Sequence, residues 1–238
     1  NSNKIYYKMN KRVVVSAVFV ITVIIVIVSF ASYQSNLLEM HDRDRYMENI
    51  IASQQSSLVN LENGSPPLGS ESAPITIVEF GDYQCEACYH WFHNTRSTLI
   101  DNYIETEKAK LVFIDMPFLG RDSITAAHAS YCAEDQGKYW EYHTMLYNFQ
   151  DGPPDSGWAD RDRLNSFAFS LDMNIDEFNE CMDSSKYKNR VKANFDEAMK
   201  NDAKSTPTFI IISQDGKTEK FAGALPYSVF AATIESML

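Results

Sequence analysis

The chain has 238 residues, of which 45% are hydrophobic, and a formal net charge of −11 at pH 7. This hydrophobic content is enough for one sizeable domain and an additional segment. The negative charge argues against a nucleic acid partner, because phosphate binding depends on clustered Lys and Arg. The number of cysteines is four, and an even number in an oxidising compartment favours disulfide bonds.

An uncharged apolar run at residues 13–30 follows a segment that contains several lysines and an arginine. Its length is at the short end of what spans a bilayer as a helix. It exceeds the apolar core of a usual signal peptide, so we expect a membrane anchor at residues 13–32, with a cleaved signal as the alternative. Because basic residues precede the run and charges balance after it, we expect residues 1–12 in the cytoplasm and the remainder outside.

Residues 33–67 are expected to form a stalk and a linker. Residues 33–52 show a moderate helical pattern, which is equally consistent with a solvated spacer. From residue 53 onwards Ser, Gln, Asn, Gly and Pro dominate, and this composition is typical of a linker. We therefore expect the folded domain at residues 68–238.

A Cys-x-x-Cys pair, Cys85 and Cys88, follows a predicted buried strand at residues 75–80. The pair is expected where this strand passes into a helix that continues to about Asn102. A thiol at a helix N-terminus faces unpaired N–H groups and the positive end of the helix dipole, which favours its thiolate. We therefore expect Cys85 to be the attacking thiol. Taken alone, the pair is equally consistent with a structural disulfide or half of a zinc site.

After the cysteine pair the pattern predicts a strand, a block of helices, a hairpin and a final helix. In chain order these elements are a strand at 109–115, two helices or one bent helix within 122–149, helices at 161–170, 176–182 and 186–202, strands at 208–213 and 219–222, and a helix at 226–238. An Asp-Gly turn separates the last two strands, as in a hairpin. This order favours an α/β fold with helices over a mixed sheet.

Several sequence stretches together resemble the DsbA-like branch of the thioredoxin superfamily. They are Ala-Pro-Ile-Thr-Ile-Val-Glu-Phe at 73–80 with Asp-Tyr-Gln-Cys at 82–85, Gly-Lys-Tyr-Trp-Glu-Tyr-His at 137–143, and Ser-Thr-Pro-Thr-Phe at 205–209. The resemblance extends from about Leu68 to the C-terminus. It implies a thioredoxin-like fold with a helical insertion at about residues 117–203, and protein-disulfide oxidoreductase activity.

The resemblance also implies roles for individual residues. Cys85 and Cys88 would be the catalytic pair. Glu79 matches a buried acid of the family and would relay a proton for Cys88, whereas an edge carboxylate in water is the alternative. Thr206 and Pro207 would form part of the substrate groove, with Pro207 in a cis peptide bond; an ordinary trans proline is the alternative.

The two remaining cysteines, Cys132 and Cys181, fall on predicted helices of the insertion. Some members of the family have a bridge there, which implies a structural disulfide between them. Two unpaired buried thiols are the alternative.

One departure from the family concerns the two residues between the catalytic cysteines. Strong oxidases of the family carry a histidine there, whereas this chain has Glu86 and Ala87. A negative charge beside Cys85 should raise the pKa of its thiol unless solvent screens it. The disulfide would then be less oxidising, so isomerase activity stays open beside oxidase activity.

We therefore predict a membrane-anchored, extracytoplasmic thiol-disulfide oxidoreductase that forms or rearranges disulfides in exported proteins. We expect no cofactor, and a zinc finger in particular is disfavoured because the Cys and His spacing near Cys85 is too tight. The resemblance implies a quinone-linked membrane oxidase of the DsbB or vitamin K epoxide reductase type as redox partner. The alternatives are a non-catalytic thioredoxin-fold binding or metal-carrier module and an outward-facing thiol reductase.

Overall fold

The computed structural model describes residues 23–43, 45 and 59–238, and the chain divides into two units, Asn1–Ser57 and Leu58–Leu238. The first unit contains a helix at Val23–Arg43 with a mean hydropathy of 1.4, which is long and apolar enough to cross a membrane. This helix continues past residue 32, the predicted end of the anchor, so residues 33–43 of the predicted stalk are helical. The predicted cytoplasmic residues 1–12, residues 13–22 of the anchor and residues 46–58 of the stalk and linker lie outside the described residues.

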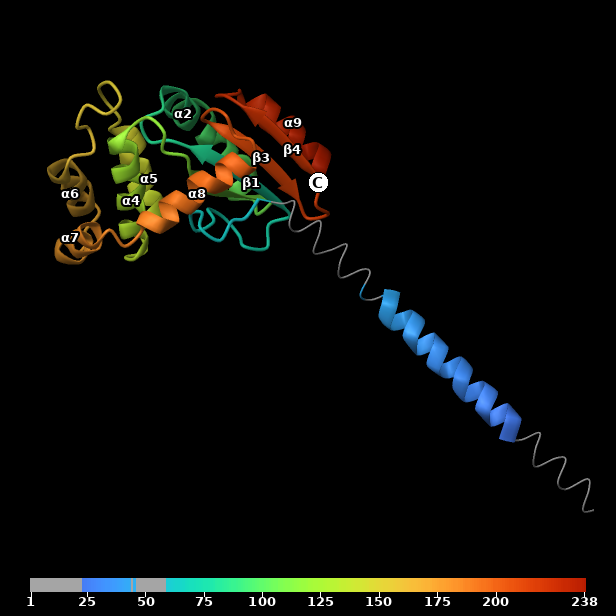
Figure 1. Ribbon diagram of the computed structural model, residues 1–238. Helices are drawn as coiled ribbons and strands as arrows, with labels where there is room; N and C mark the ends of the chain where they lie inside the picture. The colour runs from blue at the N-terminus through green and yellow to red at the C-terminus, as the bar shows by residue number, and fades with distance from the viewer. Residues whose placement is uncertain (1–22, 44, 46–58) are drawn as a thin grey trace, which may run out of the picture. The chain divides into compact units, whose positions relative to one another are not determined.

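The second unit is built on a four-stranded mixed sheet with the strand order β2-β1-β3-β4 (Figure 1). The strands are β1 (Ile75–Gly81), β2 (Ala109–Asp115), β3 (Thr208–Ser213) and β4 (Thr218–Ala222). β1 pairs in parallel with β2 and antiparallel with β3, and β3 pairs antiparallel with β4. The predicted strands match these bounds to within one residue, because β-branched runs between turn residues mark them in the sequence.

Helices cover both faces of the sheet and form a further layer beside it. They are α2 (Glu86–Trp91), η1 (Phe92–Arg96), α3 (Ser97–Leu99), η2 (Ile100–Ile104), α4 (Arg121–Glu134), α5 (Tyr139–Asn148), α6 (Arg161–Ser170), α7 (Ile175–Ser184), α8 (Lys188–Lys200) and α9 (Tyr227–Met237). The segments η1 and η2 are π-helical. The predicted helix after the cysteine pair is therefore continuous, but it alternates between α and π turns up to Ile104.

Alternate residues of β1 face opposite sides of the sheet. On one face Ile77 packs in a buried cluster with Trp91 of α2 and Phe230 of α9. On the other face Val78 packs in a cluster with Ala198 of α8. Glu79 is an even number of residues from Ile77, so its carboxyl is on the face that α2 covers.

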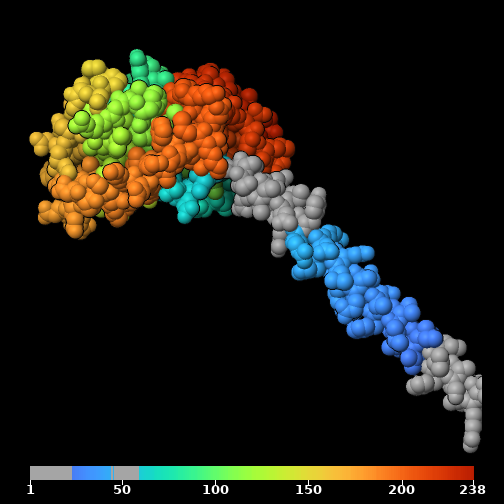
Figure 2. All heavy atoms as spheres, viewed as in Figure 1, coloured from blue at the N-terminus to red at the C-terminus, as the bar shows by residue number. Residues whose placement is uncertain are grey.

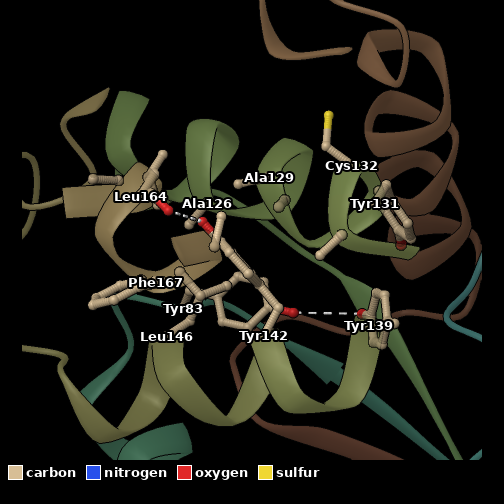
Figure 3. Packing of buried hydrophobic residues seen from close by; sticks show 14 of the residues in the cluster. Tyr83, Ala126, Ala129, Tyr131, Cys132, Tyr139, Tyr142, Leu146, Leu164 and Phe167 are labelled. Carbon is tan, nitrogen blue, oxygen red and sulfur yellow. Dashed lines mark hydrogen bonds between the residues drawn. The ribbon is translucent and has the colours of Figure 1, made fainter. Parts of the chain in front are cut away.

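Helices α4 to α8 lie between β2 and β3 in the sequence and make up the insertion, which we define as residues 117–203. Aromatic side chains of α5 pack against α4 and α6 in its core (Figure 3). The hydroxyl of Tyr142 donates to the carbonyl oxygen of Leu164 at 3.0 Å, and the hydroxyl of Tyr139 lies 3.4 Å from that of Tyr83 in the turn after β1. The insertion and the sheet therefore share a buried cluster.

A disulfide joins two helices of the insertion. Cys132 of α4 and Cys181 of α7 are bonded, with their Cα atoms 5.8 Å apart. On the face shown in Figure 2, α8 in orange lies between other parts of the insertion and the C-terminal residues in red. The disulfide ties the insertion together, and Ala198 of α8 packs against the sheet in the cluster that contains Val78.

The compact unit begins before Leu68, where the sequence placed the start of the domain. Val59 is buried in the cluster on one face of the sheet. The N–H of Ser65 donates to the carbonyl oxygen of Phe113 at 2.8 Å, and Leu68 pairs with Leu111 at the edge of β2. The Ser, Gly and Pro composition predicted a linker here, but backbone groups of an extended segment can bond to an open sheet edge whatever the side chains are.

Candidate active site

The Cys85–Cys88 pair lies at the turn between β1 and α2. Cys85 is the N-cap residue of α2, and its Sγ accepts a hydrogen bond from the backbone N–H of Cys88 at 3.2 Å. The turn before it is held by Asp82, whose carboxylate accepts from the N–H of Gln84 at 2.8 Å. A sulfur at this position meets donors that the first helical turn leaves unpaired, so a negative charge on it is stabilised.

The two sulfur atoms differ in their access to solvent. Cys85 and Cys88 are both free thiols, and their exposed fractions are 7% and 0%. Cys85 borders a surface groove, whereas Cys88 does not line it. Only the Sγ of Cys85 can therefore be reached by the sulfur of another molecule.

Hydrogen bonding and burial shift the pKa values of the two thiols in opposite directions. A hydrogen bond from the Cys88 thiol lowers the pKa of Cys85 to about 6, against the opposing effect of burial, and bonds from Thr206 and from backbone N–H groups add to this. Burial raises the pKa of Cys88 well above its ordinary value, and the neighbouring Cys85 and Glu79 raise it further. At neutral pH the reduced pair therefore holds a thiolate on Cys85 and a proton on Cys88.

Glu86 leaves this thiolate undisturbed. Its side chain is 90% exposed, and its Oε1 lies 3.7 Å from Nε2 of His90. The sequence predicted that Glu86 would raise the pKa of Cys85 unless solvent screened it, and this exposure meets that condition. The pKa of Cys85 is lowered, to about 6.

The Thr206–Pro207 peptide bond is cis and lies next to Cys85. The carbonyl oxygen of Thr206 accepts a hydrogen bond from the Cys85 thiol at 3.3 Å. The hydroxyl of Thr206 is buried and has no hydrogen-bond partner within residues 59–238. It is thus available to donate to Cys85 once that thiol ionises, which fits its lowering effect on the pKa of Cys85.

Glu79 is a buried acid behind the cysteine pair, with an exposed fraction of 1%. Neither carboxyl oxygen has a hydrogen-bond partner in the described part of the compact unit. Burial raises the pKa of Glu79 to about 8; the positive charge of Arg96 opposes this, and Cys85 adds to it. An acid with a pKa near neutrality can both give and accept a proton during a reaction.

Arg96 is a buried cation that the sequence did not identify as part of this site. It is 8% exposed, and its guanidinium carbon lies 4.9 Å from the ring centre of Phe92 and 5.5 Å from that of Trp140. Its charge lowers the pKa of Glu79. A single arginine on a helix gives no signal of this kind in sequence, because its approach to Glu79 depends on how the helix packs on β1.

A surface groove of about 650 Å³ opens beside Cys85. Residues of the insertion form one wall, and residues of the turn, of α2 and of the Thr206 loop form the other. The insertion wall includes Phe118, Leu119 and residues 150–154, and the opposite wall includes Glu86, Tyr89 and Thr206. The sequence did not identify the loop at 150–154 as part of the site, since its Pro-Pro signal predicts only a break between helices.

No group of three or more His, Cys, Asp or Glu side chains that could hold a metal ion occurs in residues 23–43, 45 and 59–238. The groups that meet at the groove are the thiol of Cys85 and, behind it, the thiol of Cys88 and the buried carboxyl of Glu79. This arrangement can exchange a disulfide with an external thiol through Cys85.

Comparisons with known proteins place this fold and site in a family. The sequence profile of the family described as thioredoxin matches residues 62–236. The probable disulfide bond formation protein D of Bacillus cereus is 29% identical over 208 residues, which cover 86% of this chain and 89% of that protein. Disulfide bond formation protein D of Bacillus subtilis is 29% identical over 180 residues, or 74% of this chain and 78% of that protein.

Solved structures show the same architecture. Oxidised BdbD from Bacillus subtilis has a TM-score of 0.67 at 26% identity and covers 75% of this chain and 94% of its own. The alpha-DsbA1 protein of Wolbachia pipientis has a TM-score of 0.68 at 24% identity and covers 77% of this chain and 95% of its own.

This chain belongs to the thioredoxin family, and within it is a DsbA-like thiol-disulfide oxidoreductase. The predicted fold class and the predicted class of enzyme are confirmed. An enzyme of this class exchanges disulfide bonds with thiol-containing substrates and depends on a redox partner.

Proposed function

We propose that this protein donates a Cys85–Cys88 disulfide to exported proteins that carry reduced cysteines. The difference in acidity between the two thiols supports this direction, because the pKa of Cys85 is lowered to about 6 and that of Cys88 is raised. A stabilised Cys85 thiolate favours the reduced enzyme, which makes the disulfide a stronger oxidant. The relatives from Bacillus are disulfide bond formation proteins by name, in agreement with this direction.

The proposed reaction begins when a substrate thiolate attacks the Sγ of Cys85. A mixed disulfide forms between substrate and Cys85, the Cys85–Cys88 bond breaks, and Cys88 leaves as a thiolate that takes up a proton. A second substrate thiolate then attacks the substrate sulfur of the mixed disulfide and releases Cys85 as a thiolate. The substrate loses two electrons and gains a disulfide, and the cysteine pair is reduced.

Glu79 is proposed to supply the proton that Cys88 takes up. Its pKa, raised by burial to about 8, keeps the carboxyl protonated at neutral pH. Cys88 is a strong base as a thiolate, because burial raises its pKa. The charge of Glu79 raises the pKa of Cys88, and this proximity supports a proton path between the two groups.

Thr206 and Pro207 are proposed to line the substrate side of the site. Pro207 has no N–H, and Thr206 lines the groove beside Cys85. An extended substrate segment can pair with backbone at such a position in the manner of an added strand.

We also propose that the enzyme is anchored in the membrane with its compact unit outside the cytoplasm. The helix at Val23–Arg43 would anchor the chain in the membrane, with the basic residues of segment 1–12 on the cytoplasmic side and the compact unit outside. A quinone-linked membrane oxidase of the DsbB or vitamin K epoxide reductase type would re-oxidise the pair. A membrane-impermeant thiol reagent applied to intact bacteria should label reduced Cys85, and protection until the cells are lysed would contradict this orientation.

Two variants test the roles of the cysteines. Cys85→Ser should abolish oxidation of a reduced protein, because no accessible sulfur remains. Cys88→Ser should accumulate mixed disulfides through Cys85, which non-reducing gels would show. A Cys132→Ser, Cys181→Ser double variant is the control and should keep turnover. Turnover by Cys85→Ser would contradict the assignment.

The reduction potential of the pair tests the direction of the reaction. We expect equilibration with glutathione buffers to give a value more oxidising than the glutathione pool outside the cytoplasm. A strongly reducing, thioredoxin-like value would instead make the protein a reductase.

A further inference from the structure

Several hydrogen bonds join the two walls of the active-site groove, and one residue of the insertion, Asp155, bonds both to the turn before Cys85 and to the start of α4. The loop that forms part of the insertion wall, residues 150–154, ends directly before it. The N–H of Asp155 donates to Oε1 of Gln84 at 2.7 Å. Gln84 immediately precedes Cys85, so this bond connects the insertion wall to the residue next to the reactive sulfur.

The carboxylate of Asp155 makes a second connection, to the start of α4. The N-cap position of this helix is Gly120, which has no side chain to accept from the first N–H groups. Oδ1 of Asp155 accepts these hydrogen bonds instead, from Arg121 at 2.6 Å and from Asp122 at 3.2 Å. The helix is therefore capped by a residue more than thirty positions away in the sequence.

Two further contacts hold this arrangement: Gly120 packs closely against Asp155, and the amide nitrogen of Gln84 bonds to α4. A Cβ atom at Gly120 would lie 2.5 Å from Cγ of Asp155, so glycine is required for the approach. Nε2 of Gln84 donates to Oγ of Ser123, a residue of α4, at 2.7 Å. Gln84 and Ser123 are 6% and 0% exposed, which shields both bonds from competition with water.

The loop itself is closed near its ends. Nε1 of Trp158 donates to the carbonyl oxygen of Phe149 at 2.7 Å, and Trp158 is 3% exposed. Asp151 in the loop forms an ion pair with Arg163 at 2.7 Å. These contacts hold the shape of the loop, and the bonds of Asp155 attach its C-terminal end to Gln84, the residue before Cys85, and to the start of α4.

We propose that Asp155 is a positioning residue that sets the width of the groove between Cys85 and the insertion, and thereby the affinity for polypeptide substrates. This inference rests on the proposed function. The occupant of the groove is the polypeptide segment next to the reacting cysteine of the substrate, because the groove is continuous with the Sγ of Cys85. A small dithiol needs only the Cys85 sulfur, whereas a polypeptide also contacts both walls.

The test compares two reductants with the full chain, using oxidised glutathione as the terminal oxidant. One is a ten-residue peptide with two cysteines, and the other is dithiothreitol. In each case the dithiol is oxidised to a disulfide, Cys85–Cys88 is reduced, and oxidised glutathione restores the pair as it becomes two reduced glutathione molecules.

Asp155→Gly removes the carboxylate and suits the backbone, because Asp155 has a φ of 57°. We expect its KM for the peptide to rise about tenfold, while the rate with dithiothreitol changes by less than about twofold. Asp155→Asn keeps an oxygen acceptor and tolerates the same φ, so it should restore the peptide KM. Faster amide exchange at Arg121 and Asp122 in Asp155→Gly, reversed in Asp155→Asn, should accompany the change.

Asp172→Gly is the matched control. Asp172 is an exposed aspartate of the insertion with a φ of 56°, and it has no side-chain hydrogen bond to any described residue. The peptide KM of this variant should equal that of the wild type. If Asp155→Gly does not fold, Ser123→Ala tests the same connection. This variant removes the hydrogen bond between Gln84 and Ser123 and should raise the peptide KM about threefold.

An unchanged peptide KM in Asp155→Gly, or an equal loss with both reductants, would overturn the proposal. An equal rise of the peptide KM in Asp172→Gly would also overturn the proposal, because the rise would then follow from an Asp→Gly substitution at another position of the insertion. If the wild-type chain oxidises neither reductant, the proposed function is contradicted, and this inference, which rests on it, is contradicted as well.

Discussion

The Sγ of Cys85 lies 3.3 Å from the carbonyl oxygen of Thr206, a residue 121 positions further along the chain. The thiol donates to this carbonyl, and the nearby hydroxyl of Thr206 has no partner among the residues described for this unit. Thr206 can therefore serve both forms of Cys85, as an acceptor for the thiol and as a donor for the thiolate. The acidity of Cys85 thus depends on a contact that folding creates.

Alkylation of Cys85 should follow the titration of a single acidic thiol. The pKa of Cys85 is lowered to about 6, first by the hydrogen bond from Cys88. The thiolate fraction, and with it the rate of reaction with iodoacetamide, should rise between about pH 5 and pH 7 and then level off. Cys88 should stay unmodified because it is fully buried. A rate that keeps rising to pH 9 would contradict the lowered pKa.

Thr206→Val should make Cys85 less acidic. The variant keeps the carbonyl group and the shape of the side chain but loses the hydroxyl that can donate to the thiolate. We expect the alkylation midpoint to move up by about one pH unit, and the disulfide to become less oxidising. Thr208→Val is the control, because its buried hydroxyl donates to Ser205 and not to Cys85. An equal effect in both variants would rule out the hydroxyl of Thr206 as the cause.

Glu79→Gln should change the dependence of stability on pH. Burial raises the pKa of Glu79 from 4.5 to about 8, so the folded state holds a proton that the unfolded state releases. The wild type should therefore lose stability as the pH rises from about 4.5 to about 8, by on the order of 5 kcal/mol relative to the variant. Unfolding in guanidinium chloride at several pH values measures this difference.

The same variant also tests the proton path. If Glu79 protonates Cys88, Glu79→Gln should slow the reduction of the Cys85–Cys88 disulfide by dithiothreitol at neutral pH by about 10-fold to 100-fold. The exposed Glu71 offers a control, since Glu71→Gln should leave this rate unchanged. An unaltered rate in Glu79→Gln would remove the relay role and leave only the effect on stability.

The Cys132–Cys181 disulfide should contribute stability and not activity. It joins residues 49 positions apart, and closing a loop of that length stabilises by about 4 kcal/mol in the chain-entropy description. The Cys132→Ser, Cys181→Ser double variant should unfold at a lower guanidinium concentration by the corresponding amount. Its rate of thiol oxidation below the transition should match the wild type, and a loss of rate there would show that the bond also shapes the site.

Tyr131→Phe should weaken the attachment of the insertion to β2. The hydroxyl of Tyr131 donates to the buried carboxylate of Asp115 and accepts from Asn194 at 2.7 Å. Its loss should cost about 1–3 kcal/mol in unfolding experiments. The pKa of Asp115 is raised by burial to about 7, and Tyr131 opposes that rise. The cost should therefore grow as the pH rises through 7, and a cost independent of pH would contradict this account.

The elements that the sequence predicted well are those with a local signal. β2 and β3 occupy the predicted residues because β-branched runs end at turn residues on both sides. The helix predicted at 176–182 is α7, and the side chain of Asn174 caps it by accepting from the N–H groups of Asp176 and Glu177. Pro226 was predicted within the first turn of the last helix and is instead its N-cap, a shift of a single residue.

Features that depend on distant contacts had no such signal. The start of α4 contains Gly120, and nothing nearby in the sequence indicates that Asp155 caps it. The segment before Leu68 has the composition of a linker, yet Ser65 bonds to the edge of β2. In both cases the partner is set by packing and not by neighbouring residues.

The sequence by itself determined the class of this protein, because the order of strands, the Cys-x-x-Cys turn and the Thr-Pro segment are all local patterns. Only the tertiary structure decided how the two thiols differ. The pKa of Cys85 is lowered first by the hydrogen bond from Cys88 and further by Thr206, which folds in from far along the chain, and the pKa of Glu79 is raised by burial against the opposing charge of Arg96. Electrostatic free energy depends on distance and on exclusion of water, and folding alone sets both quantities.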